Sequence, residues 1–557
     1  MAFSLLSITF LGLLFEIFGL ALVLPVISLL IDDSYASSNF LLNEINIFFI
    51  NVGLMDSPKF LLILIISIYV LKSIIQVSIT YQQKKIVTTL TKNLSNKLYH
   101  SYINQNYLYF TNNNKSKMIQ LLQIEMVHFF NFFESFMGLI AELIILIGIY
   151  IVVLVIEPRG ILILTFAYLI SGVLYYKLLN QRIKRWGQIR LKIDQTLSKL
   201  ILETFSVIKE IILNNKYLSF INYFNSENHT KSKYAAFQLT ANQLPRIYFE
   251  LVALISIISF IFLLIYLNTD SNTIIFILAI LAAASFKLLP SINKIITSYQ
   301  GISYYSSSFY KIYEEIKGLN FIEAELAKHE ILHFKNEINM KNLSYGYNKN
   351  NLILNNVDFK IKKGSFIGIS GKSGIGKSTF INLLTGLIEP ISGNVLLDGV
   401  DIKENMKNYQ SIIGYVSQNV FLMDESIKKN VAFELDDQLI DKEKVKKCLQ
   451  SVDLWKWVNN QEEGLETSVG EGGIKVSGGQ KHRIGIASAL YKNPDILIFD
   501  APTTALDKAT EREVMSTIIN LAFKDAKTII IVSHNLNILK ECKEIFEIKN
   551  NNIYKVN

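Results

Sequence analysis

The chain has 557 residues, of which 50% are hydrophobic, and its mean hydropathy is +0.31. Soluble domains seldom average so apolar and seldom run so long, so these values indicate a membrane protein with at least two domains. The net charge of +8 comes from dispersed lysines and not from an arginine-rich stripe, which argues against a nucleic-acid partner.

Six segments are apolar and long enough to cross a bilayer, which takes about 20 residues. In chain order they are 3–31, 60–80, 133–156, 161–180, 247–267 and 273–298. The first has no basic start and no small-residue cleavage site, and it is longer than the apolar core of a signal peptide. We therefore interpret it as a spanning helix, and the sequence predicts an all-α transmembrane bundle of six helices.

Charges in the connecting segments predict how this bundle is oriented. Residues 32–57 carry four acids and no Lys or Arg, whereas 81–131 carry six Lys against one acid and 181–245 carry ten Lys or Arg against four acids. Because basic loops stay in the cytoplasm, we place 32–57 outside and the two long loops inside. The inside loops have helical periodicity, so we expect the spans to continue as cytoplasmic helices whose tips dock on a soluble domain. Residues 40–50 predict a helix lying on the outer membrane surface.

Near residue 331 the composition changes to short apolar runs separated by glycines and polar turns, which is typical of an α/β domain. The run 366–370 predicts a buried strand, and it leads through G-K-S-G-I-G-K-S-T at 371–379 into a helical stretch. This order of strand, glycine-rich turn and helix is that of a P-loop, which binds nucleotide phosphates. We expect Lys377 to reach the β- and γ-phosphates and the Ser378 hydroxyl to bind Mg²⁺. The other phosphate-binding residues predicted here are Gly371, Ser373, Gly374, Gly376 and Thr379.

A second apolar run, 496–499, ends in Asp500. A carboxylate at the end of a buried strand that follows a P-loop is placed to hold Mg²⁺. The sequence therefore predicts a site for ATP and Mg²⁺.

Between these two features lies V-S-G-G-Q at 476–480, which resembles the signature sequence of ATP-binding-cassette (ABC) proteins. The resemblance covers about 330–550. It implies that Tyr347 stacks on adenine, that Gln418 links the Mg²⁺ site to the membrane helices, and that His534 lies near the γ-phosphate. It also implies nucleotide contacts from Asp507 and from the signature residues Ser477, Gly478, Gly479 and Gln480.

Membrane spans followed by one cassette resemble the half-transporters among ABC exporters. The resemblance implies a type IV exporter fold, with a transmembrane domain at 1–318, a linker at 319–330 and a nucleotide-binding domain at 331–557. It also implies an obligate dimer, formed with a second copy or with a homologous half-transporter. Each ATP then lies between the P-loop of one chain and the signature of the other.

The residue after Asp500 departs from the family pattern. A glutamate that orients the attacking water usually stands there, but this chain has Ala501, and no carboxylate follows before Asp507. A positioned general base contributes about 10²–10⁴-fold, so we predict tight ATP binding and slow hydrolysis. Three explanations stay open: an alanine introduced to hold the ATP-bound state, a naturally degenerate half with a complete partner, and simply slow turnover.

Four cations lie within the predicted spans: Lys72, Arg246, Lys287 and Lys294. Charges inside spans are costly and usually functional, although each of these side chains is long enough to reach the inner interface. With few compensating acids expected nearby, they predict a cavity for an anionic headgroup such as a pyrophosphate.

Three segments, 15–18, 245–248 and 288–299, are similar to the PglK-type lipid-linked-oligosaccharide flippases of bacterial N-glycosylation. The similarity implies ATP-dependent flipping of a polyprenyl-diphosphate glycan from the cytoplasmic to the outer leaflet of a bacterial inner membrane. Some arginines of that family are lysines here, which keeps the charge but loses bidentate phosphate geometry. Two alternatives stay open: an exporter of lipid A, phospholipid or peptide, and a non-transporting ATP-binding regulator.

Overall fold

The computed structural model describes residues 58–156, 158–269, 271–319, 334–347, 351–503, 507–524 and 527–556. The predicted span 3–31, the acidic segment 32–57 with its surface helix, and linker residues 320–330 lie outside these ranges. The described chain forms two compact units. One is helical, and the other is an α/β unit that includes the short segment Asn106–Tyr109.

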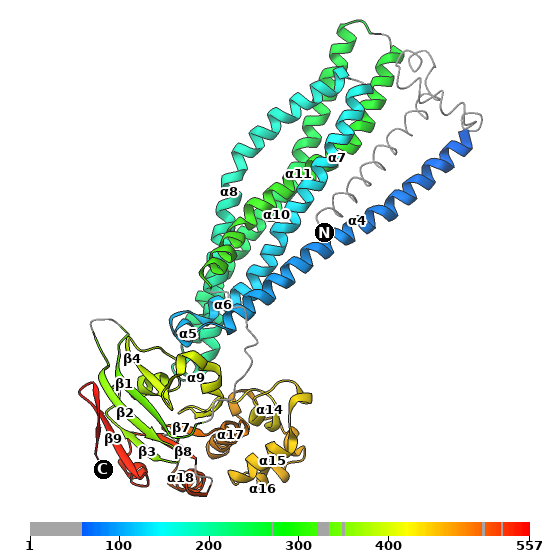
Figure 1. The fold of residues 1–557 in the computed structure, drawn as a ribbon. Helices are drawn as coiled ribbons and strands as arrows, with labels where there is room; N and C mark the ends of the chain where they lie inside the picture. Colours follow the sequence, from blue (N-terminus) through cyan, green and yellow to red (C-terminus); the bar gives the residue numbers. More distant parts are fainter. Residues whose placement is uncertain are drawn as a thin grey trace. The chain divides into compact units, whose positions relative to one another are not determined.

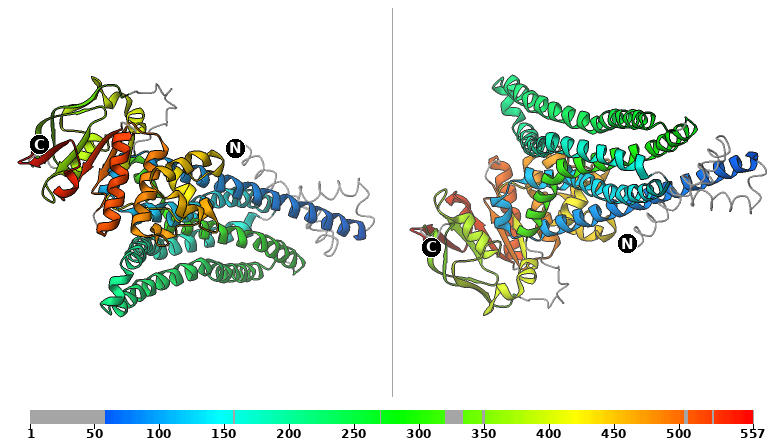
Figure 2. Two further views of the ribbon diagram at one scale, coloured as in Figure 1. Left: turned by 90° about the horizontal axis from the view of Figure 1, so that it is seen from below. Right: turned by 90° about the horizontal axis from the view of Figure 1, so that it is seen from above.

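Long helices make up the helical unit (Figure 1). They are α4 (Pro58–Ile103), α7 (Met126–Ile156), α8 (Pro158–Ser206), α10 (Tyr217–Tyr266) and α11 (Ser271–Gly318). Shorter elements lie between them along the chain: α5 (Tyr107–Asn112), whose first three residues belong to the α/β unit, α6 (Lys115–Gln120), the π-helix η1 (Leu121–Glu125) and α9 (Ile208–Leu213). Helix α7 packs along α11 and α4, and α10 packs along α8 (Figures 1 and 2).

Within the described residues, four helices are long and apolar enough to cross a membrane: Lys115–Val155, Pro158–Ser206, Tyr217–Tyr266 and Ile277–Gly318. They coincide with the last four predicted spans, and the predicted span 60–80 lies inside α4. The four helices are 41 to 50 residues long, about twice what a bilayer requires. These lengths are compatible with spans that continue as helices beyond a bilayer, and the cytoplasmic position of the continuations stays a prediction.

The strands of the described α/β unit form two sheets. A four-stranded antiparallel sheet has the order β2-β1-β4-β5, and a six-stranded sheet has the order β10-β9-β3-β8-β7-β6. The strands of the first sheet are β1 (Glu337–Tyr345), β2 (Leu354–Lys362), β4 (Ser392–Leu397) and β5 (Val400–Asp401). Those of the second are β3 (Phe366–Ser370), β6 (Ile413–Val416), β7 (Ile496–Asp500), β8 (Thr528–Val532), β9 (Glu544–Lys549) and β10 (Asn552–Lys555).

Helices and the second sheet pack on shared apolar cores. The α-helices are α12 (Lys377–Leu384), α13 (Met406–Ser411), α14 (Ile427–Ala432), α15 (Lys442–Ser451), α16 (Trp455–Asn459), α17 (Gly478–Tyr491), α18 (Lys508–Lys524) and α19 (Leu536–Leu539). Short 3-10 turns are η2 (Ile402–Asn405), η3 (Asp437–Leu439), η4 (Gly464–Glu466) and η5 (Glu471–Gly473). Every residue of β3 and β8 is buried, which explains why these strands are nearly continuous apolar runs in the sequence.

Parallel pairing in this sheet decides where the predicted site residues gather. Strands β6, β7, β8 and β3 are paired in parallel, so their carboxyl ends meet at one edge of the sheet. In open α/β sheets, ligands bind outside this edge. The P-loop follows β3 there, Asp500 ends β7, and Gln418 and His534 follow β6 and β8.

Candidate functional site

Lys377 is the first residue of α12 and lies at the mouth of the P-loop. Its Nζ donates hydrogen bonds to the carbonyl oxygens of Gly371 and Lys372, at 2.7 and 2.8 Å. Partial burial lowers the pKa of this ammonium group, and the charge of Asp500 acts in the opposite direction. The loop thus holds a cation beside the Asp500 carboxylate, where the phosphates and Mg²⁺ of a nucleotide are expected.

The start of α12 is shaped to receive an anion. Its N-cap, Gly376, has a φ of 111°, and a Cβ atom at this position would overlap the side chain of Ile353. A left-handed turn without a side chain lets the loop aim its backbone N–H groups at a phosphate, where the helix dipole adds to the attraction. Around this turn, Ser373, Gly374 and Ser378 are exposed and Thr379 is buried.

Asp500 ends β7, and it accepts a hydrogen bond of 3.2 Å from the Tyr415 hydroxyl on β6. Burial raises the pKa of Asp500, while the bond from Tyr415 and the charge of Lys377 lower it. The sequence interpretation missed Tyr415. The available signal was its position within a predicted strand, three residues before Gln418.

The Ser378 hydroxyl and the Asp500 carboxylate fit the oxygen ligands that Mg²⁺ prefers. The raised pKa of Asp500 marks a carboxylate whose charge is not fully compensated by the protein, which suits a cation site. Among the described residues, no group of three or more His, Cys, Asp or Glu side chains is placed to hold a metal.

Ala501 follows Asp500 in a fixed backbone conformation. Its φ is 48°, its N–H donates to the carbonyl oxygen of Val532 at 2.7 Å, and the residue is 8% exposed. A methyl group at this position accepts no proton. This backbone conformation sets the direction of the Cα–Cβ bond, and therefore the direction in which a longer side chain at position 501 would extend.

Three further predicted residues lie on exposed surface of the same unit. Gln418 and His534 are exposed at the carboxyl edge of the sheet. Tyr347 is 63% exposed, and its ring lies edge-on to Tyr345 with 5.5 Å between ring centroids. An aromatic ring with this exposure suits the predicted stacking on adenine.

The signature segment forms the N-terminus of α17. Ser477 is the N-cap: its Oγ accepts from the Gln480 N–H at 3.3 Å, and the Gln480 side chain accepts from the Ser477 N–H at 2.9 Å. This reciprocal pair is a capping box. It gives Gln480 a local structural role, and it fixes Ser477, Gly478 and Gly479 at a helix N-terminus suited to an anion.

Asp507 caps the neighbouring helix α18. Its Oδ1 accepts from the N–H groups of Ala509 and Thr510, and its Oδ2 accepts from the Thr510 hydroxyl at 2.7 Å. The Thr510 hydroxyl is the largest cause of the lowered pKa of Asp507. Residues 504–506, which complete the predicted inter-domain loop, lie outside the described residues.

Replacing Gly479 by alanine is expected to destabilise the chain by about 1–3 kcal/mol, because the new Cβ would overlap the Thr510 methyl group. Alanine otherwise favours a helix over glycine by roughly 0.5–1 kcal/mol. The matched control is Gly479→Ala with Thr510→Ser, which keeps the capping hydroxyl and removes the methyl group. Thermal unfolding of the full chain should show a lower midpoint for the single variant and a recovered one for the double. Equal midpoints for the two would contradict the packing explanation.

In the helical unit, three of the four predicted cations line one cavity. Arg246, Lys287 and Lys294 border a space of about 530 Å³ together with the acids Glu142 and Glu250. Lys72 is not among the lining residues, but both Lys72 and Lys287 lie against the Tyr69 ring, at 5.2 and 5.4 Å from its centroid. The four cations therefore gather in one region of α4, α10 and α11.

The expectation of few compensating acids is wrong. Lys294 Nζ is 2.7 Å from Glu142 Oε1, and Arg246 Nε is 2.9 Å from Glu250 Oε1. Glu250 is one helical turn from Arg246, and Glu142 comes from a different predicted span. The cavity lining still carries three cations against two carboxylates, so its charge is positive.

Residues 354–504 match the family model described as ABC transporter. An ATP-dependent lipid A-core flippase of Vibrio vulnificus (strain CMCP6) is 34% identical over 221 residues, which cover 39% of this chain and 37% of that protein. An ATP-dependent lipid A-core flippase of Pectobacterium atrosepticum is 33% identical over 233 residues, which cover 42% of this chain and 40% of that protein.

An uncharacterized ABC transporter ATP-binding protein, YwjA of Bacillus subtilis, is 32% identical over 48% of this chain and 46% of that protein. The chain thus matches less than half the length of these curated relatives. The fold is similar to the solved structure of a bacterial Atm1-family ABC exporter with ATP bound. The match covers 99% of this chain and 94% of the exporter chain, with a TM-score of 0.77 and a sequence identity of 18%. This likeness confirms the predicted fold class, a helical transmembrane region followed by an α/β nucleotide-binding domain.

Proposed function

We propose that this chain is one half of an ABC exporter that uses ATP to move a lipid with an anionic headgroup across a bacterial inner membrane. The substrate class that we favour is a polyprenyl-diphosphate-linked oligosaccharide, flipped from the cytoplasmic to the outer leaflet. The observation that carries this proposal is the positive cavity at Arg246, Lys287 and Lys294, within a chain that also holds a P-loop, Asp500 and a signature helix.

ATP binding in this proposal joins two copies of the chain, or this chain and a homologous half-transporter. The P-loop N–H groups and Lys377 bind the phosphates, and Ser378 and Asp500 hold Mg²⁺. The capped N-terminus of α17 from the other chain then presents Ser477 and its free N–H groups to the γ-phosphate. Because the γ-phosphate binds both the P-loop of one chain and the α17 N-terminus of the other, the two nucleotide-binding domains close on each other only when ATP is bound. Ala501 leaves the closed state without the usual general base, so ATP hydrolysis is expected to be slow and the closed, ATP-bound state to be long-lived.

The cavity suits a diphosphate because its cations are positioned before the ligand arrives. Glu250 and Glu142 hold Arg246 and Lys294 by ion pairs, and Tyr69 lies beside Lys287. Arginine binds phosphate oxygens through a planar fork, and lysine contributes a point charge. A headgroup with two or more negative charges would gain from all three at once.

A second candidate substrate follows from the relatives named lipid A-core flippases. A phosphorylated lipid would use the same cations, so the cavity alone does not separate it from a diphosphate-linked glycan. The non-transporting regulator remains a third possibility, which Ala501 would permit.

A flipping assay tests the proposal. The chain and its Ala501→Glu variant are reconstituted in proteoliposomes with a fluorescent polyprenyl-diphosphate glycolipid, and access to the label from outside is followed after ATP is added. We expect ATP-dependent flipping, faster with Ala501→Glu and absent with Lys377→Ala. Lipid that stays in its leaflet while both active forms bind ATP would refute flipping of this class and favour the regulator.

Neutralising the cavity cations should weaken the response to lipid. In the Ala501→Glu background, Arg246→Gln with Lys287→Gln is expected to raise the lipid concentration for half-maximal ATPase stimulation at least tenfold, because two charge-assisted contacts to phosphate are lost. The exposed Lys192, which lies on α8 and outside the cavity, provides the matched control Lys192→Gln. A curve that shifts equally in both variants would reject the charged-cavity hypothesis.

A further inference from the structure

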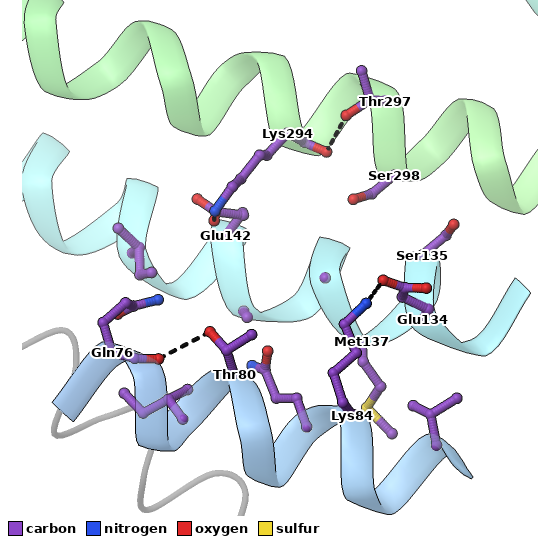
Figure 3. Close-up of a pocket in the computed structure, with 16 residues that line it drawn as sticks. Gln76, Thr80, Lys84, Glu134, Ser135, Met137, Glu142, Lys294, Thr297 and Ser298 are labelled. Carbon is purple, nitrogen blue, oxygen red and sulfur yellow. Dashed lines mark hydrogen bonds and ion pairs between the residues drawn. The ribbon is translucent and has the colours of Figure 1, made fainter. Parts of the chain in front are cut away.

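A second cavity opens between α4, α7 and α11 beside the first (Figure 3). Its volume is about 340 Å³, within the range of small-molecule sites. Two ion pairs border it: Lys84 of α4 with Glu134 of α7, and Lys294 of α11 with Glu142 of α7. Figure 3 shows both lysines reaching across to α7 from opposite sides of the cavity.

Ten of the sixteen residues that line this cavity are polar or charged, and the other six are apolar or glycine. Besides the four charged groups it includes the amides of Gln76 and Gln83 and the hydroxyls of Thr80, Ser135, Thr297 and Ser298. Three of these hydroxyls donate their hydrogen to a backbone carbonyl one turn earlier: Thr80 to Gln76, Ser135 to Asn131 and Thr297 to Asn293. Their oxygen lone pairs are therefore what they offer to a ligand, and the amide and ammonium groups supply the donors.

The charge balance indicates which ligands this lining suits. Two cations face two carboxylates, so the cavity does not favour an anion, and each carboxylate already has a lysine partner, which disfavours a metal ion. An apolar ligand would take the polar side chains of this lining out of water without giving them new hydrogen bonds. A neutral polyol matches it, because each hydroxyl both donates and accepts, and a hydroxyl that donates to a carboxylate makes a strong, charge-assisted bond.

The polar cavity continues directly into the positive cavity. Gln76, Glu142, Ile145 and Lys294 line both. Along α11, Lys287 lies in the positive cavity and Ser298 in the polar one, 11 residues further on, which is roughly 16 Å of helix. One ligand with an anionic group next to a polyol would therefore occupy both cavities in a fixed order.

We propose that this cavity binds the first sugars of the transported lipid headgroup, while the diphosphate lies at Arg246 and Lys287. The inference rests on the proposed function and extends it: the site recognises the glycan as well as the charge. Glu134 is the key residue, because it lines only the polar cavity, whereas Glu142 and Lys294 serve both.

Binding of two matched lipids to the full chain in detergent tests this site. The probes are a short-chain polyprenyl diphosphate and the same lipid carrying a disaccharide of N-acetylglucosamine. The unmodified chain should bind the glycolipid at least tenfold more tightly. Glu134→Gln should weaken glycolipid binding about tenfold, the loss of one charge-assisted hydrogen bond, and leave the bare diphosphate lipid unchanged. Ser298→Ala is a second variant that removes a hydroxyl without disturbing an ion pair.

The control variant is Glu250→Gln, which alters only the positive cavity and should shift both lipids alike. Equal affinity of the unmodified chain for the two lipids would overturn the sugar site and leave the proposed function standing. Weakening of both lipids by Glu134→Gln would likewise overturn it, because the residue would then act on the fold. If neither lipid binds to any form, the proposed function itself fails.

Discussion

Ala501→Glu is expected to raise the ATPase rate of the purified chain at least tenfold, and up to about 10⁴-fold, the range of a positioned general base. The backbone at this position is fixed by the hydrogen bond that the Ala501 N–H donates to the Val532 carbonyl. Asp500 ends β7 and Val532 ends β8, so this bond lies at the carboxyl edge of the sheet, two residues before His534. Both alanine and glutamate carry a Cβ, so the left-handed φ of 48° costs the variant little more than it costs the present residue. The measurement is phosphate release at saturating ATP and Mg²⁺.

Two control variants separate chemistry from packing. Ala501→Gln has nearly the same size as the glutamate variant but cannot act as a base, so it should show no gain. Lys377→Ala added to Ala501→Glu should abolish the gain, because Lys377 lies at the mouth of the phosphate-binding loop. If Ala501→Gln accelerated hydrolysis as much as Ala501→Glu, the missing base would not be the cause of slow turnover.

The same experiment bears on the three explanations for Ala501. A large gain in the chain on its own shows that every other part of the site is competent in a homodimer, as expected for an introduced alanine or for slow turnover. No gain alone but a gain with a homologous half-transporter favours a degenerate half that needs a complete partner.

The nucleotide site was predictable from the sequence because its parts are local. The run 366–370 and the glycine turn after it form β3 and the start of α12, and 496–499 lies in β7. Short apolar runs bounded by turn residues are continuous signals, and parallel pairing then brings their ends together. The capping box between Ser477 and Gln480 was also available, since serine followed three residues later by glutamine is its pattern.

Contacts between distant segments were not predictable. Lys294 and Glu142 are 152 residues apart, and Tyr415 and Asp500 are 85 apart, so neither pair leaves a periodic trace in the sequence. The Arg246–Glu250 pair differs, because its i,i+4 spacing was readable and was overlooked. The polar cavity at Glu134 combines three helices, and its lining residues have ordinary helix-surface spacing in each.

Buried charges between the helices are the clearest example of what the sequence left hidden. Arg190 of α8 is 5% exposed, and Glu125 of η1 and Asp194 of α8 are 0% and 1% exposed. The guanidinium is 3.1 Å from Asp194 Oδ2 and 3.5 Å from Glu125 Oε2, and it donates to the Ser308 hydroxyl of α11 at 2.6 Å. Lys231 of α10 is 2.7 Å from the other oxygen of Asp194. One cluster thus joins four elements, and Glu125 enters it from a π-helix, a local widening often found at functional sites.

Arg190→Met should therefore destabilise the chain by about 3–5 kcal/mol, because it leaves two buried carboxylates with too few partners. The measurement is the thermal unfolding midpoint of the full chain in detergent. Lys199→Met is the control: it breaks the exposed Lys199–Glu203 pair of the same helix, at 3.6 Å, and should cost no more than about 1 kcal/mol.

Arg190→Met combined with Glu125→Gln distinguishes a charge effect from lost packing. The amide removes one unpaired carboxylate and keeps the hydrogen bond that Gln120 Nε2 donates to Glu125 Oε1 at 2.8 Å, so part of the lost stability should return. Loss of packing alone predicts no recovery, because the second change does not refill the space that Arg190 occupied. A midpoint for Arg190→Met as high as that of Lys199→Met would instead mean that water reaches the cluster, since only solvation would then offset the unpaired charges.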